Sequence, residues 1–240
     1  MSDSTRRART FSVTTTAIAV TIHLLAATAV ADTIAIIGTG RVASALGPQF
    51  AKQGHRIIYG SREPDRDEVR DLVARTHETA SALPSADAVR QADIVVLAVP
   101  WTAAEAVVKS LGDLSGKIVI DPTNPYNRGE AGLARLVVET SAGELIQGWA
   151  PGAKVVKAFN TMSSAVMADP ASAGGPVTVP MVGDDDEAKA KVATIIEGMG
   201  LEVMDLGPIR YAHVVEGMLV VWANARFLGH PFNFYLRPQP

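Results

Sequence analysis

Short apolar runs alternate with longer polar or amphipathic segments along most of this 240-residue chain. The runs at residues 33–37, 56–59, 93–100 and 154–159 consist mainly of β-branched and other apolar side chains. This pattern is typical of strands that are buried on both faces of a parallel sheet. Because helix-length segments separate these runs, the sequence predicts an α/β fold with a doubly wound, mostly parallel sheet of the Rossmann type.

The remaining segments give weaker signals of the same alternation. Further strands are expected at residues 80–82, 117–120, 177–182 and 201–205. Helices are expected after Gly40 and at residues 64–75, 85–91, 102–111, 141–149, 184–200 and 208–228. Residues 127–138 show no clear pattern, and residues 167–175 are expected to form a loop rich in small residues. We therefore expect a Rossmann domain at residues 32–206 and a small helical extension at residues 207–240.

A glycine-rich motif, G-x-G-x-x-A, follows the first strand. Gly38 allows a tight turn, Gly40 lets a pyrophosphate approach the backbone, and Ala43 lets the next helix pack closely on the sheet. The unpaired N–H groups at the start of that helix face the phosphates. The motif predicts a dinucleotide site; the alternative is a glycine turn in an ordinary βαβ unit.

The tip of the second strand indicates which dinucleotide binds. Chains that bind NAD usually place a carboxylate there, on the ribose 2′-hydroxyl. Here the tip is Gly60-Ser61-Arg62, and the first carboxylate is that of Glu63. A hydroxyl and a guanidinium suit a 2′-phosphate, since arginine matches phosphate oxygens with a planar fork of donors. We therefore predict NADP rather than NAD; the alternative is that Arg62 is merely solvated.

Other candidates follow later strands, whose carboxyl ends meet at the same sheet edge. Val99, Pro100 and Trp101 end the strand at residues 93–100, although Trp101 could equally be a core residue. Asn124 follows the strand at residues 117–120 and offers an amide, but asparagine is also a common turn residue. Asn160 follows the strand at residues 154–159.

Composition excludes several other classes of function. The formal net charge is −3, which gives no case for nucleic-acid binding. The chain has no cysteine, which excludes disulfides and thiolate metal sites. Three consecutive acids at residues 184–186 begin a predicted helix, where acids are common, and no nearby residues complete a ligand set. We therefore predict no metal site.

The first 31 residues resemble an export signal. Arg6, Arg7 and Arg9 form a basic head, residues 17–27 are mostly apolar, and residues 29–31 read Ala-Val-Ala, a cleavage site. The paired arginines resemble a twin-arginine signal, which would place the product in the periplasm without a membrane anchor. Cleavage would change the net charge from −3 to −5, because three arginines and Asp3 are lost. The alternatives are a cytoplasmic protein or one anchored by residues 13–31.

Taken in order, several motifs resemble the deazaflavin-dependent NADP reductases, the factor 420:NADP oxidoreductase family. The matching pieces lie at residues 36–40, 60–62, 95–101, 121–125, 155–161, 182–185 and 207–210. The resemblance implies a hydride transfer between NADP and a deazaflavin, and it runs from about residue 33 to residue 229. Pyrroline-5-carboxylate reductases share the first half but carry a larger helical domain than the roughly 35 residues left here.

The resemblance also implies the residues that hold the cofactor. By position, the residues implied to bind the pyrophosphate are Gly38, Thr39, Gly40, Arg41 and Val42. Those implied to bind the 2′-phosphate are Ser61 and Arg62. Those implied to surround the ribose and nicotinamide are Val99, Pro100, Asn124, Ala158 and Asn160.

Two features depart from the family. The helix at residues 208–228 carries His213 and Glu216-Gly217, where relatives often have an arginine and Glu-Pro, so the acceptor could be a deazaflavin, a flavin or a small carbonyl or imine. His213 is then a candidate proton donor, although a histidine on an apolar helix is more often a packed residue. The export signal is the second departure. Alternative functions are a flavin-linked metalloreductase module and a non-catalytic NADP sensor. The protein could also form a homodimer.

Overall fold

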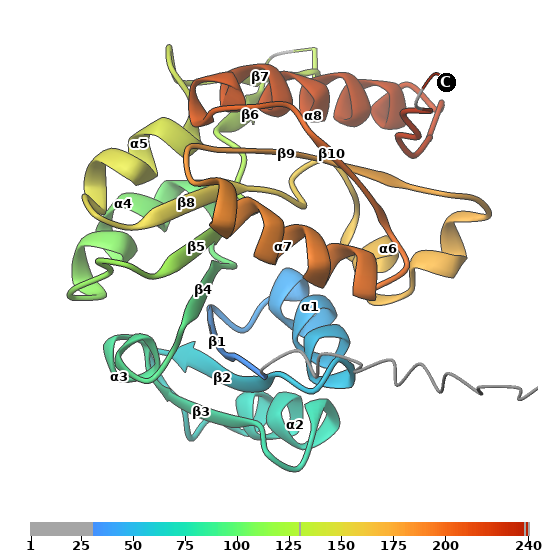
Figure 1. Ribbon diagram of the computed structural model, residues 1–240. Coiled ribbons are helices and arrows are strands. Elements are labelled where there is room, and N and C mark those ends of the chain that lie inside the picture. The colour runs from blue at the N-terminus through green and yellow to red at the C-terminus, as the bar shows by residue number, and fades with distance from the viewer. Residues whose placement is uncertain (1–30, 130, 238, 240) are drawn as a thin grey trace, which may run out of the picture. The chain divides into compact units, whose positions relative to one another are not determined.

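A computed structural model describes residues 31–240 except residues 130, 238 and 240, and these residues form one unit (Figure 1). The predicted export signal lies outside the described residues, apart from Ala31. Within the described residues, no helix is both long and apolar enough to cross a membrane. The C-terminal extension predicted at residues 207–240 packs as part of the same unit.

Eight strands form one sheet in the order β10-β9-β8-β5-β4-β1-β2-β3. The strands are β1 (Thr33–Ile37), β2 (Arg56–Ser61), β3 (Ser81–Pro84), β4 (Ile94–Leu97), β5 (Ile118–Asp121), β8 (Lys154–Lys157), β9 (Thr178–Gly183) and β10 (Glu202–Asp205). Neighbouring strands from β3 to β8 are parallel, whereas β9 is antiparallel to β8. The predicted mostly parallel, doubly wound sheet is therefore confirmed.

Helices cover both faces of this sheet. The helices are α1 (Arg41–Lys52), α2 (Asp67–Thr76), α3 (Ser85–Arg90), α4 (Trp101–Ser110), α5 (Ala142–Trp149), α6 (Ser164–Ala168), α7 (Asp186–Gly198) and α8 (Ala212–Phe227), with short 3-10 turns at Pro170–Ala173 and Ile209–Tyr211. Ile34 and Ile36 of β1 pack in the core with α1, α2, α6 and α7, whereas Ala35 and Ile37 pack in the core with α3, α4, α5 and α8. Alternate residues of a strand point to opposite faces, which explains why β1 is apolar throughout.

Two segments differ from the sequence-based expectation. The segment at residues 127–138, which showed no pattern, contains an antiparallel pair, β6 (Tyr126–Arg128) and β7 (Ala134–Leu136). The loop expected at residues 167–175 is instead occupied by the end of α6 and a 3-10 turn. The strands β6 and β7, the helix α6 and the 3-10 turn are all very short, so each has too few residues for a periodic signal.

The strand order creates a crevice at one edge of the sheet. The chain leaves β1 for β2 and β3 on one side and then crosses to β4 on the other side of β1. Loops that leave β1 and β4 therefore diverge, and ligands of such sheets lie beyond the carboxyl ends of the strands at this point. The predicted site residues follow β1, β2, β4, β5 and β8.

Candidate functional site

The turn after β1 has the geometry that its glycines predict. Gly38 has a φ of +107°, and a Cβ atom there would lie 2.4 Å from the carbonyl oxygen of Ala98. Its N–H donates to the carbonyl of Gly60 at 2.9 Å. Gly40 caps α1, and a Cβ there would meet nothing within 4 Å. Gly38 is thus required by the protein's own backbone, whereas Gly40 leaves open space in front of the helix N-terminus.

A cleft extends along this edge as two adjoining hollows, of about 360 Å³ and 540 Å³, which share Gly40 and residues 98–100. The first hollow lies toward β2 and α2, and Ser61, Arg62 and Arg66 are among its lining residues. The second lies toward β5, and its lining includes Arg41, Trp101, Asn124 and Tyr126. The positive end of the α1 dipole therefore lies at the junction of the two hollows.

The first hollow is the basic end of the cleft. Ser61 is buried at the end of β2, and its hydroxyl oxygen accepts a hydrogen bond from the N–H of Glu63 at 3.1 Å. Arg62 and Arg66 are both exposed. Arg66, which we did not predict from the sequence, caps α2 and pairs with Glu68 at 3.0 Å. The signal available was a second arginine four residues after Arg62, just before a helix.

The second hollow ends at a pair of asparagines. The side-chain amide of Asn124 donates to the carbonyl of Asn160 at 3.0 Å, and the amide of Asn160 donates to Asn124 Oδ1 at 3.0 Å and to the carbonyl of Val215 at 3.2 Å. Among the described residues, the buried Oδ1 of Asn160 has no hydrogen-bond partner. Phe159 before it has a φ of +65°, which is rare for a bulky residue and costs ~1–3 kcal/mol. Such orphaned atoms and strained residues cluster at ligand sites.

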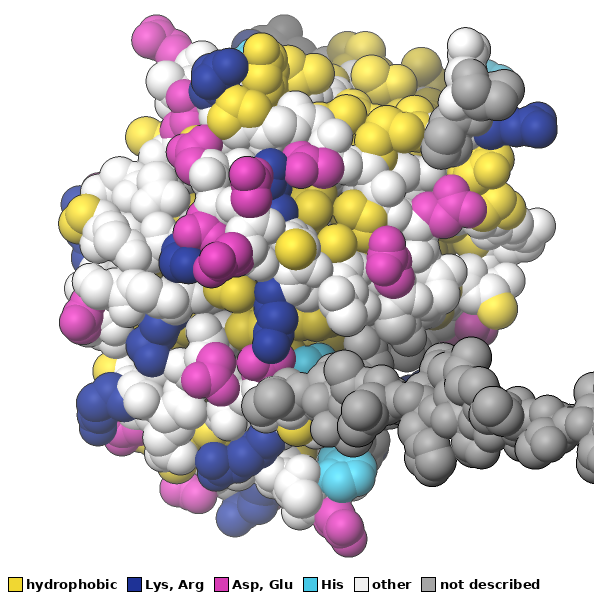
Figure 2. Space-filling model, in the orientation of Figure 1, with side chains coloured by type: hydrophobic (Ala, Val, Ile, Leu, Met, Phe, Trp, Pro, Cys, Tyr) yellow, Lys and Arg dark blue, Asp and Glu magenta, His cyan; other side chains and the backbone are white. Residues whose placement is uncertain are grey.

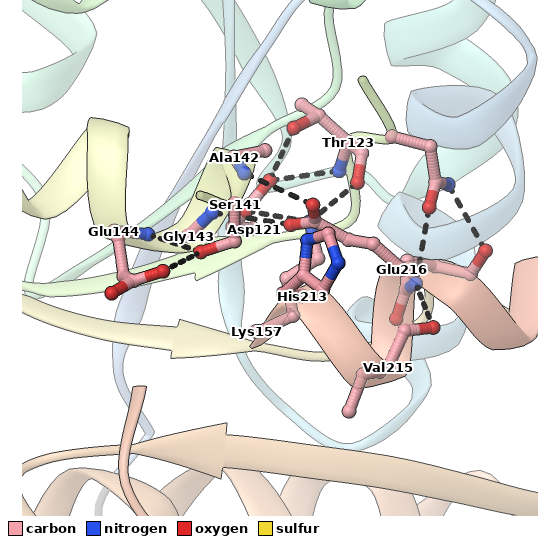
Figure 3. Close-up of polar contacts among 12 residues, drawn as sticks. Asp121, Thr123, Ser141, Ala142, Gly143, Glu144, Lys157, His213, Val215 and Glu216 are labelled. Carbon is pink, nitrogen blue, oxygen red and sulfur yellow. Dashed lines mark hydrogen bonds and ion pairs between the residues drawn. The ribbon is translucent and has the colours of Figure 1, made fainter. Parts of the chain in front are cut away.

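Asp121, Lys157 and Glu216 form a fully buried charged triad (Figure 3). Asp121 and Lys157 come three residues before Asn124 and Asn160 in the chain. The ammonium of Lys157 lies 2.8 Å from Asp121 Oδ2 and 2.9 Å from Glu216 Oε1, and it donates to the carbonyl of Thr123 at 2.5 Å. Asp121 Oδ1 accepts from the N–H and the hydroxyl of Thr123 at 2.8 Å and 2.7 Å. The triad therefore joins the ends of β5 and β8 to α8.

Glu216 also holds the N-terminus of α5. Its carboxylate oxygens accept from the N–H groups of Ala142 and Gly143 at 3.0 Å and 3.2 Å. Burial raises the pKa of Glu216, while the charge of Lys157 opposes that rise. The helix dipole and Lys157 thus compensate for part of the cost of burying two carboxylates against one cation. We did not predict this triad from the sequence, although a lysine inside a buried strand signals a buried partner.

The structure brings most of the predicted cofactor residues to one cleft. Ten of them line its two hollows: Gly38, Thr39, Gly40, Arg41, Val42, Ser61, Arg62, Val99, Pro100 and Asn124. Asn160 does not line either hollow, but its side chain is hydrogen-bonded to that of Asn124, which does. Ala158 is fully buried in the core and also lines neither hollow. Trp101 lines the second hollow and stacks on Trp149 with ring centroids 5.6 Å apart, so it serves both the cleft and the packing.

The predicted catalytic residue, His213, is exposed on α8 and lines neither hollow. Its Nδ1 lies 2.5 Å from the carbonyl oxygen of Thr140, which can only accept, so this nitrogen carries the proton. The hydrogen bond is one that a packed histidine would make. A role for His213 in catalysis stays a prediction, with no support from its position.

The cleft, the glycine turn and the sheet together define a dinucleotide-binding domain of the Rossmann class, and known proteins identify its family. Residues 33–125 match the family described as NADP oxidoreductase coenzyme F420-dependent. A crystal structure described as a candidate F420-dependent NADP-reductase of Arthrobacter sp. FB24 is 34% identical and superposes with a TM-score of 0.78, covering 86% of this chain and 100% of that one. The chain therefore belongs to this family and is an NADP-dependent oxidoreductase.

Two curated relatives show how far the likeness extends. The F420-dependent NADP reductase of Methanothermobacter thermautotrophicus is 27% identical over 221 residues, which cover 85% of this chain and 93% of that protein. Metalloreductase STEAP3 of Rattus norvegicus is 29% identical over 196 residues, which cover 78% of this chain but 36% of the rat protein. The chain thus spans nearly all of the first relative and about a third of the second.

Proposed function

We propose that this protein transfers a hydride between NADPH, held along the cleft, and a deazaflavin or flavin that enters the second hollow. The observation that carries this proposal is the composition of that hollow, which combines open space with a lining that, among the described residues, has no carboxylate, lysine or histidine. The dihydronicotinamide supplies the hydride when NADPH is bound. The chain itself binds, orients and shields the reacting groups, because such transfers depend on positioning.

The protein's own residues suit each part of NADP. Open space at Gly40 and the N–H groups of α1 suit a pyrophosphate. Ser61, Arg62 and Arg66 at the first hollow suit a 2′-phosphate, since arginines pair with phosphate oxygens. The Oδ1 of Asn160 has no partner within the described part of the chain, and the N–H₂ group of a carboxamide would supply the hydrogen-bond donor that it lacks.

The second hollow favours a ring acceptor over a carbonyl. Among the described residues, no carboxylate, lysine or histidine lines it. Reduction of a carbonyl or imine needs a proton donor within hydrogen-bond reach of the reacting atom. A flavin or deazaflavin ring accepts a hydride without a side-chain acid, and the apolar lining of Val99, Pro100 and Trp101 suits such a ring.

Tyr126 supports a competing acceptor. Its phenol, 40% exposed, lines the second hollow and could donate a proton to a small carbonyl or imine. A Tyr126→Phe variant separates the two acceptor classes. If the acceptor is a flavin-type ring, this variant should keep most of its activity. If a carbonyl or imine accepts, activity should fall by about 100-fold or more, as expected on loss of a general acid.

The resemblance to the rat protein favours a second candidate, a flavin-linked metalloreductase module. In that case NADPH would reduce a flavin, and a ferric chelate would then take electrons from the flavin. This candidate shares the first step with our proposal, and it differs in the final acceptor.

An acceptor screen on the purified full-length chain tests these functions, with oxidation followed at the NADPH absorbance band. Deazaflavin, flavins, flavin with a ferric chelate, and a panel of carbonyls and imines are each offered with NADPH or NADH. We expect rapid oxidation of NADPH by a deazaflavin or flavin and much slower oxidation of NADH. Oxidation by carbonyls or imines alone would refute the acceptor class, and NADPH binding without turnover would favour a sensor.

A further inference from the structure

Asp32 lies directly before β1, at the end of the sheet opposite the cofactor cleft. Its carbonyl oxygen accepts from the N–H of Arg56 on β2 at 3.0 Å, which joins it to the sheet. Its side chain is buried, and Oδ1 lies 2.9 Å from the ammonium of Lys191 on α7. Within the residues that the structure describes, the buried Oδ2 has no hydrogen-bond partner. A buried carboxylate oxygen without a partner is rare and needs an explanation.

His55 contacts Asp32 but cannot satisfy its Oδ2. The N–H of Asp32 donates to Nδ1 of His55 at 3.2 Å. Nδ1 uses its lone pair as the acceptor and therefore carries no proton, so it has no hydrogen to donate to Oδ2, which lies 3.5 Å away. Burial lowers the pKa of His55, which favours this neutral form even though the charge of Asp32 opposes the shift. The peptide nitrogen of residue 32 thus has one N–H group beside two acceptors.

From this mismatch, we propose that the place between Asp32, His55 and Lys191, which we call the Asp32 site, binds the α-ammonium group of a chain that begins at Asp32. Hydrolysis of the Ala31–Asp32 bond by a signal peptidase would add one water, which leaves a carboxylate on Ala31 and an amine on Asp32. The proposal rests on this cleavage, which the sequence predicts and which N-terminal sequencing tests separately.

An α-ammonium group has the donors that the Asp32 site needs. It is protonated at neutral pH and carries three N–H groups, whereas the peptide nitrogen carries one. One N–H can donate to His55 Nδ1, as the peptide N–H does. A second can donate to Asp32 Oδ2, since an aspartate side chain can reach its own backbone nitrogen. Both acceptors are then satisfied by a single nitrogen.

The charges around the Asp32 site favour one more cation. A hollow of about 290 Å³ adjoins Asp32 between α7 and the amino ends of β4 and β5. Figure 2 shows acidic and basic side chains mixed on the surface over α7, which Figure 1 labels. The described charged residues that line the hollow are three acids and two lysines: Asp32, Asp93, Glu187, Lys154 and Lys191. With His55 neutral, these side chains sum to −1, and an α-ammonium group would bring the sum to zero.

The backbone already holds the nitrogen of residue 32 in position. The N–H of Thr33 donates to Asp93 Oδ2 at 2.9 Å, and the N–H of Asp93 donates to the carbonyl of Thr33 at 2.9 Å. Together with the bond from Arg56, these contacts fix residues 32 and 33 at the end of the sheet. An α-ammonium group would therefore bind without further ordering of the chain, which lowers the cost of binding.

Melting temperatures of chains with different first residues test this proposal. Residues 31–240 form one unit, so chains that begin at Ala31 or at Asp32 can be compared with the full-length chain. We expect the chain that begins at Asp32 to melt roughly 3–12 °C above the one that begins at Ala31, because the ammonium of Ala31 is one residue away from both acceptors. Asp32→Asn should remove at least half of this difference. Asp67→Asn, at a carboxylate that is 89% exposed on α2, is the matched control and should leave the difference unchanged.

The reactivity of the α-amine gives an independent test. An acylating reagent, followed by mass spectrometry of the N-terminal peptide, should modify the chain that begins at Asp32 at least about 10-fold more slowly than the one that begins at Ala31, since pairing with a carboxylate favours the unreactive ammonium. Equal rates, equal melting temperatures, or a difference that survives Asp32→Asn would overturn the proposal. If ammonium chloride, but not tetramethylammonium chloride, stabilised the full-length chain while the two shorter chains melted together, the Asp32 site would belong to a dissolved cation and the proposal would be wrong.

Discussion

Replacement of Lys157 by methionine should strongly destabilise the protein. The ammonium of Lys157 is the cation between Asp121 and Glu216, and all three side chains are fully buried. Methionine keeps a similar shape but leaves two buried carboxylates facing each other. Removing one partner from a buried ion cluster costs about 3–5 kcal/mol. For a domain of this size, about 2–4 °C per kcal/mol corresponds to a fall in melting temperature of roughly 6–20 °C.

Urea denaturation and thermal melting, followed by circular dichroism, would measure this loss. Lys154→Met is the matched control, because Lys154 is on the same strand but pairs with Asp185 at 3.0 Å with 34% of its side chain exposed. That control should lose much less stability. The difference in stability between the two variants should decrease as the pH falls, since protonation neutralises the carboxylates of Asp121 and Glu216 that remain in Lys157→Met. Equal losses in the two variants would refute the assigned role of the triad.

Four further predictions concern the cofactor, the triad and the N-terminus. Arg62→Ala should remove a charge-assisted contact worth ~1.5–3 kcal/mol and weaken NADPH binding about 10- to 100-fold, with NADH nearly unchanged; equal losses in a fluorescence titration would contradict this. Gly40→Val should abolish NADPH binding with normal circular dichroism, because its side chain would fill the open space before α1. Burial raises the pKa of Glu216 above its ordinary value of 4.5, so its contribution to stability is complete below pH 4.5 and is lost as the pH rises through the raised pKa. The stability of Glu216→Gln, measured relative to that of the wild type, should therefore rise as the pH is raised from 4.5 toward neutrality. A stability difference that does not change with pH in urea titrations would be evidence against this. If residues 1–31 are an export signal, N-terminal sequencing of the exported product should begin at Asp32, and a product that retains these residues would rule the signal out.

The glycine turn and the basic end of the cleft could be predicted because each depends on neighbours in the chain. Gly38 needs a positive φ for a turn between β1 and α1, and Arg62 directly follows the next strand, β2. These features follow from local sequence once a buried strand is recognised. The directions of the outer strands of the sheet depend less on neighbouring residues in the chain. The antiparallel direction of β9 leaves no mark in its apolar pattern, because a strand buried on both faces looks the same in either direction.

The buried triad could not be predicted in the same way. Asp121 and Lys157 are 36 residues apart in the chain, and they meet because β5 and β8 are adjacent in the sheet. Glu216 joins them from α8, a helix whose sequence is apolar on both sides and so does not show which side faces the core. Pairing of this kind requires the strand order as well as the strand positions. The sequence indicated only that Lys157, inside a buried strand, needed a partner.

The position of the triad also determines which part of the cofactor should respond when it is broken. Lys157 is on β8, directly before the segment that carries Asn160, and the amide of Asn160 bonds to the carbonyl of Val215, beside Glu216 on α8. The basic end of the cleft, at Arg62, directly follows β2, which is on the other side of β1 from β8. In Lys157→Met protein that remains folded, we therefore expect NADPH and NADH to lose affinity by the same factor, because the two cofactors differ only in the 2′-phosphate. Arg62→Ala should change the ratio of the two affinities, and a changed ratio in Lys157→Met would mean that the two ends of the cleft are coupled through the sheet.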